Sequence, residues 1–280
     1  MEIHKRKAVS TERIEIASVW LERAVFIDAY LPQIITEPNG LSLLLINDGQ
    51  DLERISFSDI LEDLYDQDRI RPLLCLGIHA GSERKMEYGT AGVPDFRGRG
   101  AKAQQYTRFI FDELIPQIRK KYHVPEFREK SFAGFSLGAL SALDIVWNHP
   151  QEFLKVGVFS GSLWWRCRDK HDPEYRDDQD RIMQQAVRHG SYFPWLKFFF
   201  ECGAGDEGED RNKNGVIDSI DDTLDLIEEL KAKGWRDHED ICFMLIEDGK
   251  HDLPTWARAW PEFLQWGWSK SNACICRKSA

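Results

Sequence analysis

Apolar runs of strand length alternate with amphipathic stretches along the chain. Two alternating segments, residues 13–20 and 24–31, come first and indicate an antiparallel pair of strands. Further apolar runs predict strands at 41–46, 72–78, 131–133, 156–160, 196–202 and 241–246. Helical spacing predicts helices near 58–65, 104–121, 137–147 and 221–233, with a last helix after residue 252. This alternation predicts an α/β fold with a mostly parallel central sheet and helices on both faces.

The pattern shows neither an internal repeat nor a linker, so residues 1–280 are expected to form a single domain. A dense charge run at 166–181 indicates an irregular, solvated excursion at about 162–194. A second interruption, rich in acidic residues, is expected as a loop insertion at 206–222.

Composition narrows the classes of partner. The formal net charge of −10 argues against nucleic acid, which requires a basic surface, and disfavours anionic membranes. No apolar run reaches the length of a membrane span, and the basic start of the chain is not followed by the apolar stretch of a signal peptide. The oligomeric state cannot be deduced from these features.

Six cysteines are scattered without a repeated spacing, which favours a reduced, cytoplasmic protein. Cys75, Cys202 and Cys242 fall in or beside apolar runs, where a free cysteine acts as a small buried hydrophobe. Cys274 and Cys276 stand in a polar tail without the other ligands of a zinc site.

Ser136 stands at the centre of a G-x-S-x-G pentapeptide, between a predicted strand and a predicted helix. In that setting the turn is tight, and Gly134 and Gly138 allow the backbone to pass where a Cβ would clash. The pentapeptide alone has moderate specificity, since small residues around a serine are common in ordinary turns. With a base and an acid in the right order, it predicts a nucleophile elbow.

Both partners follow in the expected order of serine, acid and histidine, each after a later strand. His251 is the predicted general base, because it lies between the last strand and the last helix. Asp206, after the strand at 196–202, is the predicted orienting acid, and Glu207 is the alternative. His79 is interpreted as a structural or rim residue, and Asp252 as a helix N-cap.

An oxyanion needs two backbone N–H donors. Leu137, directly after the nucleophile, is the first candidate, and Gln50, after the early Asn47-Asp48-Gly49 turn, is the second. Turn chemistry alone also explains the Asn-Asp-Gly sequence, and the two interpretations are compatible.

Taken together, these motifs resemble the esterase D-like branch of the α/β-hydrolases over nearly the whole chain. The resemblance is carried by 30–32, 44–50, Arg84 with 87–89, 109–118, 134–138, 160–165 and 249–252 with Trp256. It implies an α/β-hydrolase fold, a Ser136–Asp206–His251 triad and an oxyanion hole at Gln50 and Leu137. It also suggests that Trp164, Trp165 and Arg84 border the substrate, although core or rim packing would account for either tryptophan. Asn47 departs from the family pattern, which leaves the local loop shape open.

Residues 210–221 match a calcium loop with Asp in place of the final Glu. The expected ligands are side-chain oxygens and one carbonyl, from Asp210, Asn212, Asn214, Val216, Asp218 and Asp221. Helix capping would explain the last four residues equally well, but not Asp, Asn, Asn and Gly at alternating positions. We therefore expect a structural Ca²⁺ beside Asp206 and no organic cofactor.

The sequence predicts a serine carboxylic-ester hydrolase that acts on a small-molecule ester through an acyl-enzyme. An acyltransferase or thioesterase of the same fold is the alternative, and a non-catalytic, calcium-stabilised binding scaffold is a third possibility. The physiological substrate cannot be read from the residues.

Overall fold

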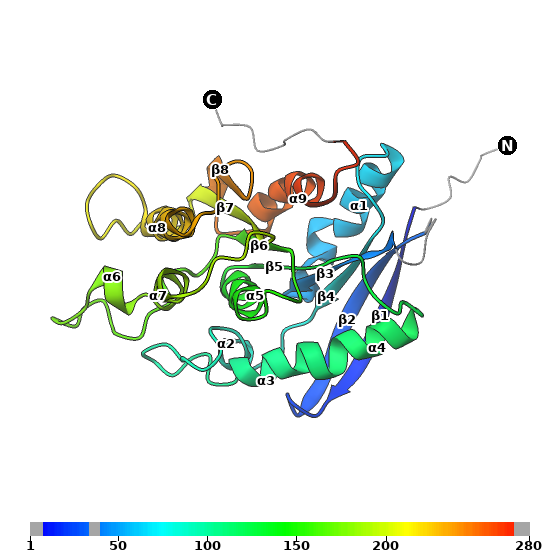
Figure 1. Ribbon diagram of the computed structural model, residues 1–280, viewed down its shortest axis with the longest axis horizontal. Helices are drawn as coiled ribbons and strands as arrows, with labels where there is room; N and C mark the ends of the chain where they lie inside the picture. Colours follow the sequence, from blue (N-terminus) through cyan, green and yellow to red (C-terminus); the bar gives the residue numbers. More distant parts are fainter. Residues whose placement is uncertain (1–7, 34–39, 272–280) are drawn as a thin grey trace.

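The computed structural model describes residues 8–33 and 40–271. Eight strands form one sheet in the order β1-β2-β4-β3-β5-β6-β7-β8 (Figure 1). The strands are β1 (Val9–Ser18), β2 (Arg23–Pro32), β3 (Ser42–Asn47), β4 (Leu73–Ile78), β5 (Lys130–Phe135), β6 (Lys155–Phe159), β7 (Lys197–Gly205) and β8 (Ile241–Lys250).

The sheet is mostly parallel. β1 and β2 pair in antiparallel fashion, as their alternating pattern predicts, and β2 is also antiparallel to β4. From β4 across to β8 every neighbouring pair is parallel. Parallel pairing brings the carboxyl ends of these strands to one edge, where the loops that follow them meet.

Helices cover both faces of the sheet and enclose two apolar cores. One core packs the sheet against α3 (Ala103–Arg108), η4 (Phe109–Leu114), α4 (Ile115–Lys121), α5 (Leu137–Asn148), α7 (Ile182–His189) and α8 (Asp218–Lys233). The other packs it against α1 (Phe57–Asp66) and α9 (Leu253–Trp268). The architecture is that of an α/β-hydrolase, as predicted.

The predicted helix at 104–121 is continuous but contains a π-helical turn, η4, immediately before Pro116. Proline lacks an N–H and clashes with the carbonyl four residues earlier, which explains why the regular hydrogen-bond pattern widens there.

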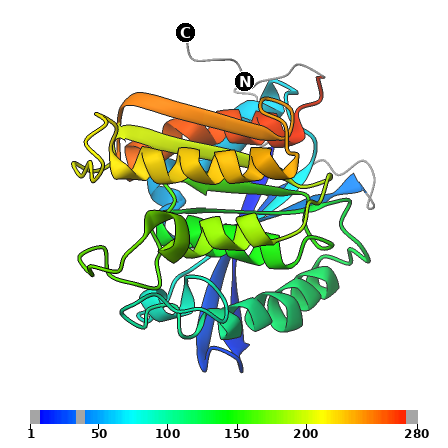
Figure 2. The ribbon, with the colours of Figure 1, turned by 60° about the vertical axis from the view of Figure 1, so that its left-hand side comes forward.

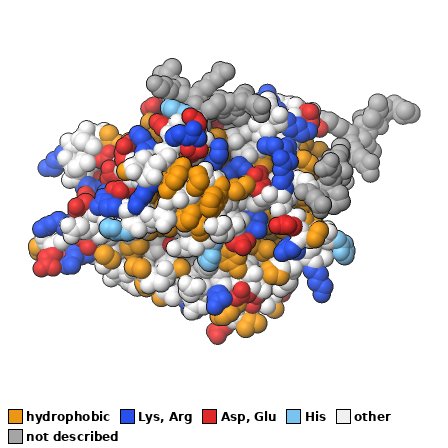
Figure 3. Space-filling view, viewed as in Figure 1, with side chains coloured by type: hydrophobic (Ala, Val, Ile, Leu, Met, Phe, Trp, Pro, Cys, Tyr) orange, Lys and Arg blue, Asp and Glu red, His pale blue; other side chains and the backbone are white. Residues whose placement is uncertain are grey.

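Three long loops project to the same side of the molecule, on the left of Figure 2. They follow β4 (including α2, Arg84–Glu87), β6 (including α6, Asp177–Asp180) and β7. The segment 162–194, expected to be irregular, therefore contains α6 and α7, and α8 begins at Asp218 rather than after 221. Charged side chains of both signs intermix over this side of the surface (Figure 3).

Two further expectations concern membranes and cysteines. Among the described residues, no helix has both the length and the apolar character needed to cross a membrane.

Cys75 and Cys202 are free and buried, as expected. Cys242 is disulfide-bonded, which corrects its assignment as a free buried thiol. Cys274 and Cys276 lie outside the described residues.

Candidate active site

Ser136 occupies a sharp turn between β5 and α5. Its backbone angles, φ 53° and ψ −120°, lie outside the regions that non-glycine residues ordinarily adopt. A Cβ on Gly134 would lie 2.5 Å from the carbonyl oxygen of Gly138, and one on Gly138 would lie 2.5 Å from Asp48 Oδ2. Gly134 is thus required by the close approach of the backbone at Gly138, and Gly138 by the side chains of Asp48 and Asn47, which fits a nucleophile elbow.

The segment after β6 holds the elbow from the other side. Ser136 donates its N–H to the Phe159 carbonyl (2.9 Å), and Ser162 donates its N–H to the Ser136 carbonyl (3.1 Å). The hydroxyl of Ser162 lies 3.4 Å from the Ser136 hydroxyl. The nucleophile candidate is therefore placed by three segments and remains partly exposed.

A buried network joins the loop after β3 to the start of α5. Asn47 donates through Nδ2 to the Gly138 carbonyl (2.7 Å) and accepts from the Tyr106 hydroxyl at Oδ1 (2.5 Å). Asp48 donates its N–H to the Tyr88 hydroxyl (3.2 Å). Asn47, the departure from the family pattern, is therefore the residue that ties this loop to the elbow.

The two oxyanion candidates lie at the two ends of this network. Leu137 is the first residue of α5, where backbone N–H groups have no intrahelical acceptor. Gln50 lies in the short helix η2 (Gly49–Asp51), with an exposed side chain that accepts the N–H of Ala80 (3.0 Å). The two residues stand on segments that the Asn47–Gly138 hydrogen bond joins, and an oxyanion hole requires two N–H donors from neighbouring segments.

Arg84 is turned toward the loop that carries Gln50. Its guanidinium makes a two-point ion pair with the buried Asp48 carboxylate, with distances of 2.6 and 2.7 Å. It also lies 5.2 Å from the centre of the Tyr88 ring. Arg84 thus stabilises the loop after β3, and its side chain stays partly exposed.

His251 and Asp206 come together from the loops after β8 and β7. Burial lowers the pKa of His251, the nearby Asp206 carboxylate opposes this shift, and the Arg84 guanidinium adds to it. The His251 ring also packs edge-on against Trp256, at 5.2 Å between ring centres. Burial raises the pKa of Asp206, against the effects of the Ser160 hydroxyl and of His251.

A lowered pKa keeps His251 neutral near pH 7, as a general base requires. Neither carboxylate oxygen of Asp206 has a hydrogen-bond partner among the described residues, although both are shielded from solvent. The alternative acid, Glu207, is exposed and lines a neighbouring cavity. Asp252, as predicted, caps α9 by accepting the N–H of Thr255 (3.0 Å).

A family model described as Putative esterase matches residues 18–266. The chain belongs to the Putative esterase family. It is an esterase-type hydrolase, in agreement with the resemblance inferred from its motifs. A comparison with functionally curated proteins returned no match.

Solved structures of esterases share the fold of this esterase at low sequence identity. A ferulic acid esterase superposes with a TM-score of 0.68 at 18% identity, covering 93% of this chain and 98% of that one. The enterobactin esterase of Shigella flexneri gives 0.70 at 19% identity, covering 94% and 60%. An IroE-like serine hydrolase from Shewanella oneidensis gives 0.67 at 17%, covering 91% and 79%.

Sequence reasoning did not single out Glu201, a buried carboxyl group on β7 that lies close enough to Asp206 to feel its charge. Its side chain is fully buried, and neither oxygen has a hydrogen-bond partner within the described parts of the chain. Burial, with a contribution from Asp206, raises its pKa to about 8. The Ser160 hydroxyl affects both carboxyl groups and accepts the indole N–H of Trp256 (2.9 Å). The only sequence signal was a single acid inside the apolar run at 196–202.

The two tryptophans expected at the substrate differ in position. Trp165 is fully buried and donates its indole N–H to Thr90 Oγ1 (3.0 Å). It packs against Gly89, where a Cβ would lie 2.8 Å from the ring, so the expectation that it borders the substrate is corrected to a packing role. Trp164 is partly exposed and lines the same cavity as Glu207.

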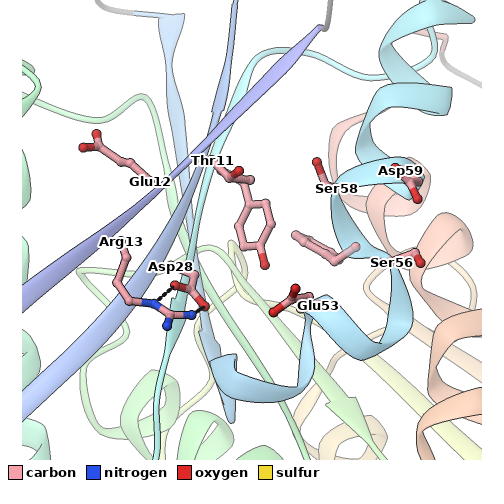
Figure 4. A pocket seen from close by; sticks show the side chains of 10 residues that line it. Thr11, Glu12, Arg13, Asp28, Glu53, Ser56, Ser58 and Asp59 are labelled. Carbon is pink, nitrogen blue, oxygen red and sulfur yellow. Dashed lines mark hydrogen bonds and ion pairs between the residues drawn. The ribbon is translucent and has the colours of Figure 1, made fainter.

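His79 hydrogen-bonds Asp28 through Nε2 (2.7 Å), so it is engaged away from Ser136, in keeping with a structural role. Asp28 also pairs with Arg13 in the wall of a cavity of about 460 Å³ (Figure 4). This cavity opens between β1, β2 and residues 53–59, and Figure 4 shows Glu53 facing into it. It contains none of the predicted triad residues.

The predicted calcium loop folds so that its amide and acid side chains converge. Asn212 and Asn214 both donate to Asp221 Oδ2 (2.8 and 2.9 Å), and Asp210 accepts the backbone N–H groups of Asn214 and Gly215. Val216 donates its N–H to Asn214 Oδ1 (2.8 Å).

Asp218, the remaining predicted ligand, is turned away from this group. It accepts the N–H of Arg211 (2.7 Å) and is also ion-paired with the Arg211 side chain. Across residues 8–33 and 40–271, no group of three or more His, Cys, Asp and Glu side chains has the arrangement of a metal site. Amide and carbonyl oxygens would have to supply the other ligands of a cation here.

Proposed function

We propose that the chain is a serine ester hydrolase in which Ser136 is the nucleophile, His251 the general base and Asp206 the orienting acid. The strained backbone of Ser136 carries this proposal. A non-glycine residue at φ 53° and ψ −120° costs free energy, and two glycines with no room for a Cβ enclose it. Such strain is typical of a serine that must present its hydroxyl at the edge of a sheet.

In this mechanism His251 removes the hydroxyl proton as Ser136 Oγ attacks the ester carbonyl carbon. The negative charge that develops on the carbonyl oxygen is stabilised by the backbone N–H groups of Leu137 and Gln50. His251 then protonates the departing alcohol, which leaves Ser136 acylated. A water molecule, deprotonated by His251, hydrolyses the acyl-enzyme and restores the serine.

The acid is assigned to Asp206 rather than Glu207 because Asp206 acts electrostatically on His251 and is shielded from solvent. An anionic Asp206 stabilises the imidazolium that forms during attack. The substrate class proposed is a small-molecule ester. This matches the ferulic acid and enterobactin esterases that share the fold.

Labelling with a fluorophosphonate probe tests the assignment, because such probes modify activated serines. We expect stoichiometric labelling of the folded protein, an adduct at Ser136 by peptide mass spectrometry, and loss of labelling and of nitrophenyl-ester hydrolysis in Ser136→Ala. A Ser58→Ala variant, altered in the cavity of about 460 Å³, is the control and should label like the wild type. An adduct on Ser162 instead, or no adduct, would refute the proposal.

We also propose that the loop at 210–221 binds a structural Ca²⁺ through Asp210, Asn212, Asn214, Asp221 and the Val216 carbonyl. The convergence of Asn212 and Asn214 on Asp221 supports this, and the side chains and carbonyl named are the oxygen ligands that Ca²⁺ prefers. The ion would stiffen the loop that begins at Asp206.

A cytoplasmic location stays a prediction. The disulfide at Cys242 counts against it, because disulfides persist chiefly in oxidising compartments.

A further inference from the structure

A cavity of about 270 Å³ adjoins the proposed triad, between the loops that follow β4, β6 and β7. Trp164 in its wall stands two residues after Ser162, whose hydroxyl is 3.4 Å from that of Ser136. Glu207, in the opposite wall, directly follows Asp206. Since consecutive Cα atoms are about 3.8 Å apart, the walls begin within roughly 8 Å of these site residues along the backbone. A substrate bound at Ser136 can extend into this cavity.

Five cationic side chains line this cavity, in a chain whose net charge is −10. They are Arg97, Arg99, Arg166, Lys170 and Arg211. Whether these positive charges are available to a ligand depends on which of the five side chains are already paired with carboxylates.

Three of the cations have carboxylate partners. Lys170 pairs with Glu209 and Arg99 with Asp95, while Arg211 pairs with Asp177, Asp218 and Asp222. These pairs also account for two of the three acids in the cavity wall. The third is Glu207, an exposed residue whose carboxyl group is partly shielded by its neighbours. This partial desolvation and the nearby acids raise its pKa.

Arg97 and Arg166 remain. Neither forms an ion pair within 4.0 Å with any carboxylate in the described part of the chain. Asp169 is close enough for both guanidinium groups to contribute to its lowered pKa, but its strongest interaction is with the N–H of His171. Two permanent positive charges in this cavity are therefore left without a direct counter-ion.

Within the described chain, Arg166 lacks a hydrogen-bond partner at one nitrogen as well as a counter-ion. Its Nε is shielded from solvent and has no hydrogen-bond partner among residues 8–33 and 40–271, which is unfavourable for a buried donor. The guanidinium lies between the rings of Trp164 and Tyr175, at 5.8 and 5.7 Å from their centres. Arg97 lies in the same way at 5.1 Å from the Phe96 ring. Both guanidinium groups thus lie against aromatic rings. Arg166 also acts as a hydrogen-bond donor to the Tyr175 hydroxyl, while its Nε stays without a partner among the described residues and the Arg97 side chain is exposed.

We infer that this cavity binds an oxyanion group (carboxylate, sulfate or phosphate) carried by the ester substrate. The inference rests on the proposed esterase function, since the cavity is read as an extension of that site. Guanidinium forks match the paired oxygens of such groups and bind them through charge-assisted hydrogen bonds. Trp164 and Phe96 supply apolar surface for the part of the substrate that carries the anion. The structure thus assigns the enzyme to anionic rather than neutral esters.

The test compares nitrophenyl hemiesters of linear dicarboxylic acids with neutral nitrophenyl alkanoates of equal chain length. Over a series of chain lengths, the wild type should prefer the anionic member of the best pair by about tenfold or more in kcat/KM. The preference should shrink as ionic strength rises, because salt screens the attraction.

Arg166→Gln and Arg97→Gln should each lower the ratio of anionic to neutral kcat/KM by about tenfold, mainly through KM for the anionic ester. Arg166→Lys should restore only part of the ratio, because an ammonium group keeps the charge but lacks the fork. Arg119→Gln, which removes an exposed arginine on α4, is the matched control and should keep the wild-type ratio.

The two proposals fail in different ways. Serine-dependent hydrolysis with no preference for the anionic ester, or an unchanged ratio in both glutamine variants, would overturn the oxyanion subsite and leave the esterase assignment standing. If neither ester is hydrolysed, calorimetric titration of the wild type with glutarate decides the matter. Binding that Arg166→Gln abolishes supports the subsite, and absence of binding to the wild type refutes it.

Discussion

At the scale of single residues, the most unusual group is Glu201, a fully buried carboxyl on β7. A charged carboxylate without hydrogen-bond partners is costly in the interior, so the protonated form is favoured and the pKa rises to about 8. Between the ordinary value of 4.5 and about 8, the folded chain therefore holds a proton that the unfolded chain releases. Stability must fall as the pH rises through this range.

Glu201→Gln should remove this dependence, because glutamine is neutral throughout and nearly the same shape. A pKa change from 4.5 to about 8 corresponds to at most about 5 kcal/mol, at roughly 1.4 kcal/mol per pH unit. Urea denaturation at pH 5 and pH 8 should show the wild type losing a few kcal/mol relative to the variant. The exposed Glu152→Gln is the control. Parallel stability curves for wild type and Glu201→Gln would show that Glu201 is ionised in the fold.

The sequence could reveal a residue only where its role follows from its position in the chain. It could not reveal a role that depends on partners brought together by the fold. Ser136, Asp206 and His251 follow their strands in a known order, and the structure brings the last two close enough to affect each other's pKa. Glu201 reads as a stray acid in an apolar run, because its meaning arises only from Ser160 and Asp206 above it. Trp164 and Trp165 are adjacent in sequence, yet only the backbone path decides that one lines a cavity and the other fills the core.

At the scale of elements, the loop after β3 and the start of α5 are joined by one buried asparagine. Asn47 connects Tyr106, on α3, with the Gly138 carbonyl on α5. The position of the proposed oxyanion donors therefore depends on a helix that carries no catalytic group. The sequence predicted the strand, the helix and the elbow separately. The two hydrogen bonds that link them join residues 59 and 91 positions apart, so no local pattern could predict them.

Tyr106→Phe should expose this dependence. The variant leaves Asn47 Oδ1 buried without its donor, which should cost about 1–3 kcal/mol in the free energy of unfolding. Because the loop loses its anchor, kcat for a nitrophenyl ester should also fall by roughly tenfold, with KM little changed.

Tyr65→Phe provides a matched comparison, since the Tyr65 hydroxyl also makes part-buried hydrogen bonds, with the backbone of Leu73. It lies on α1, on the opposite face of the sheet from α3. It should lower stability by a similar amount and leave kcat intact. Equal effects of the two variants on kcat would mean that the Asn47 network has no special part in catalysis.

At the scale of the whole molecule, the mostly parallel sheet and the antiparallel first strands followed from the alternation of patterns, because a parallel sheet needs a helical crossover between strands. The order of the strands in the sheet was not predicted. The loops at the carboxyl edge did not follow in the same way. Their charges pair across 39 residues in the case of Lys170 and Glu209, and 41 in the case of Arg181 and Asp222. The sequence shows only that these loops contain many charged residues. The fold decides which of the charged side chains form ion pairs and which arginines stay unpaired.

Calcium is the ligand expected to act on this whole edge, since the segment 206–217 that joins β7 to α8 carries both Asp206 and most of the proposed calcium ligands. Binding to the folded form alone stabilises it by about 2.7 kcal/mol when free Ca²⁺ is at 100 times the Kd. At roughly 2–4 °C per kcal/mol for a chain near this size, the melting temperature should rise by about 5–10 °C over chelator-treated protein. The rise should come with a gain in kcat if the ion steadies Asp206.

Scanning calorimetry with EDTA and with added Ca²⁺ measures this shift, and the variants identify the ligands. Asp210→Asn and Asp221→Asn should abolish it, because each removes a charged oxygen ligand. Glu209→Gln changes an acid just outside the proposed ligand set and should keep it. Asp218→Asn distinguishes two arrangements of the loop. The melting shift should persist if Asp218 binds Arg211, as in the structure, and should disappear if its carboxylate is a calcium ligand instead. Identical melting curves for the wild type in EDTA and Ca²⁺ would leave the loop as a capped turn, held by Asp221 and its two asparagines alone.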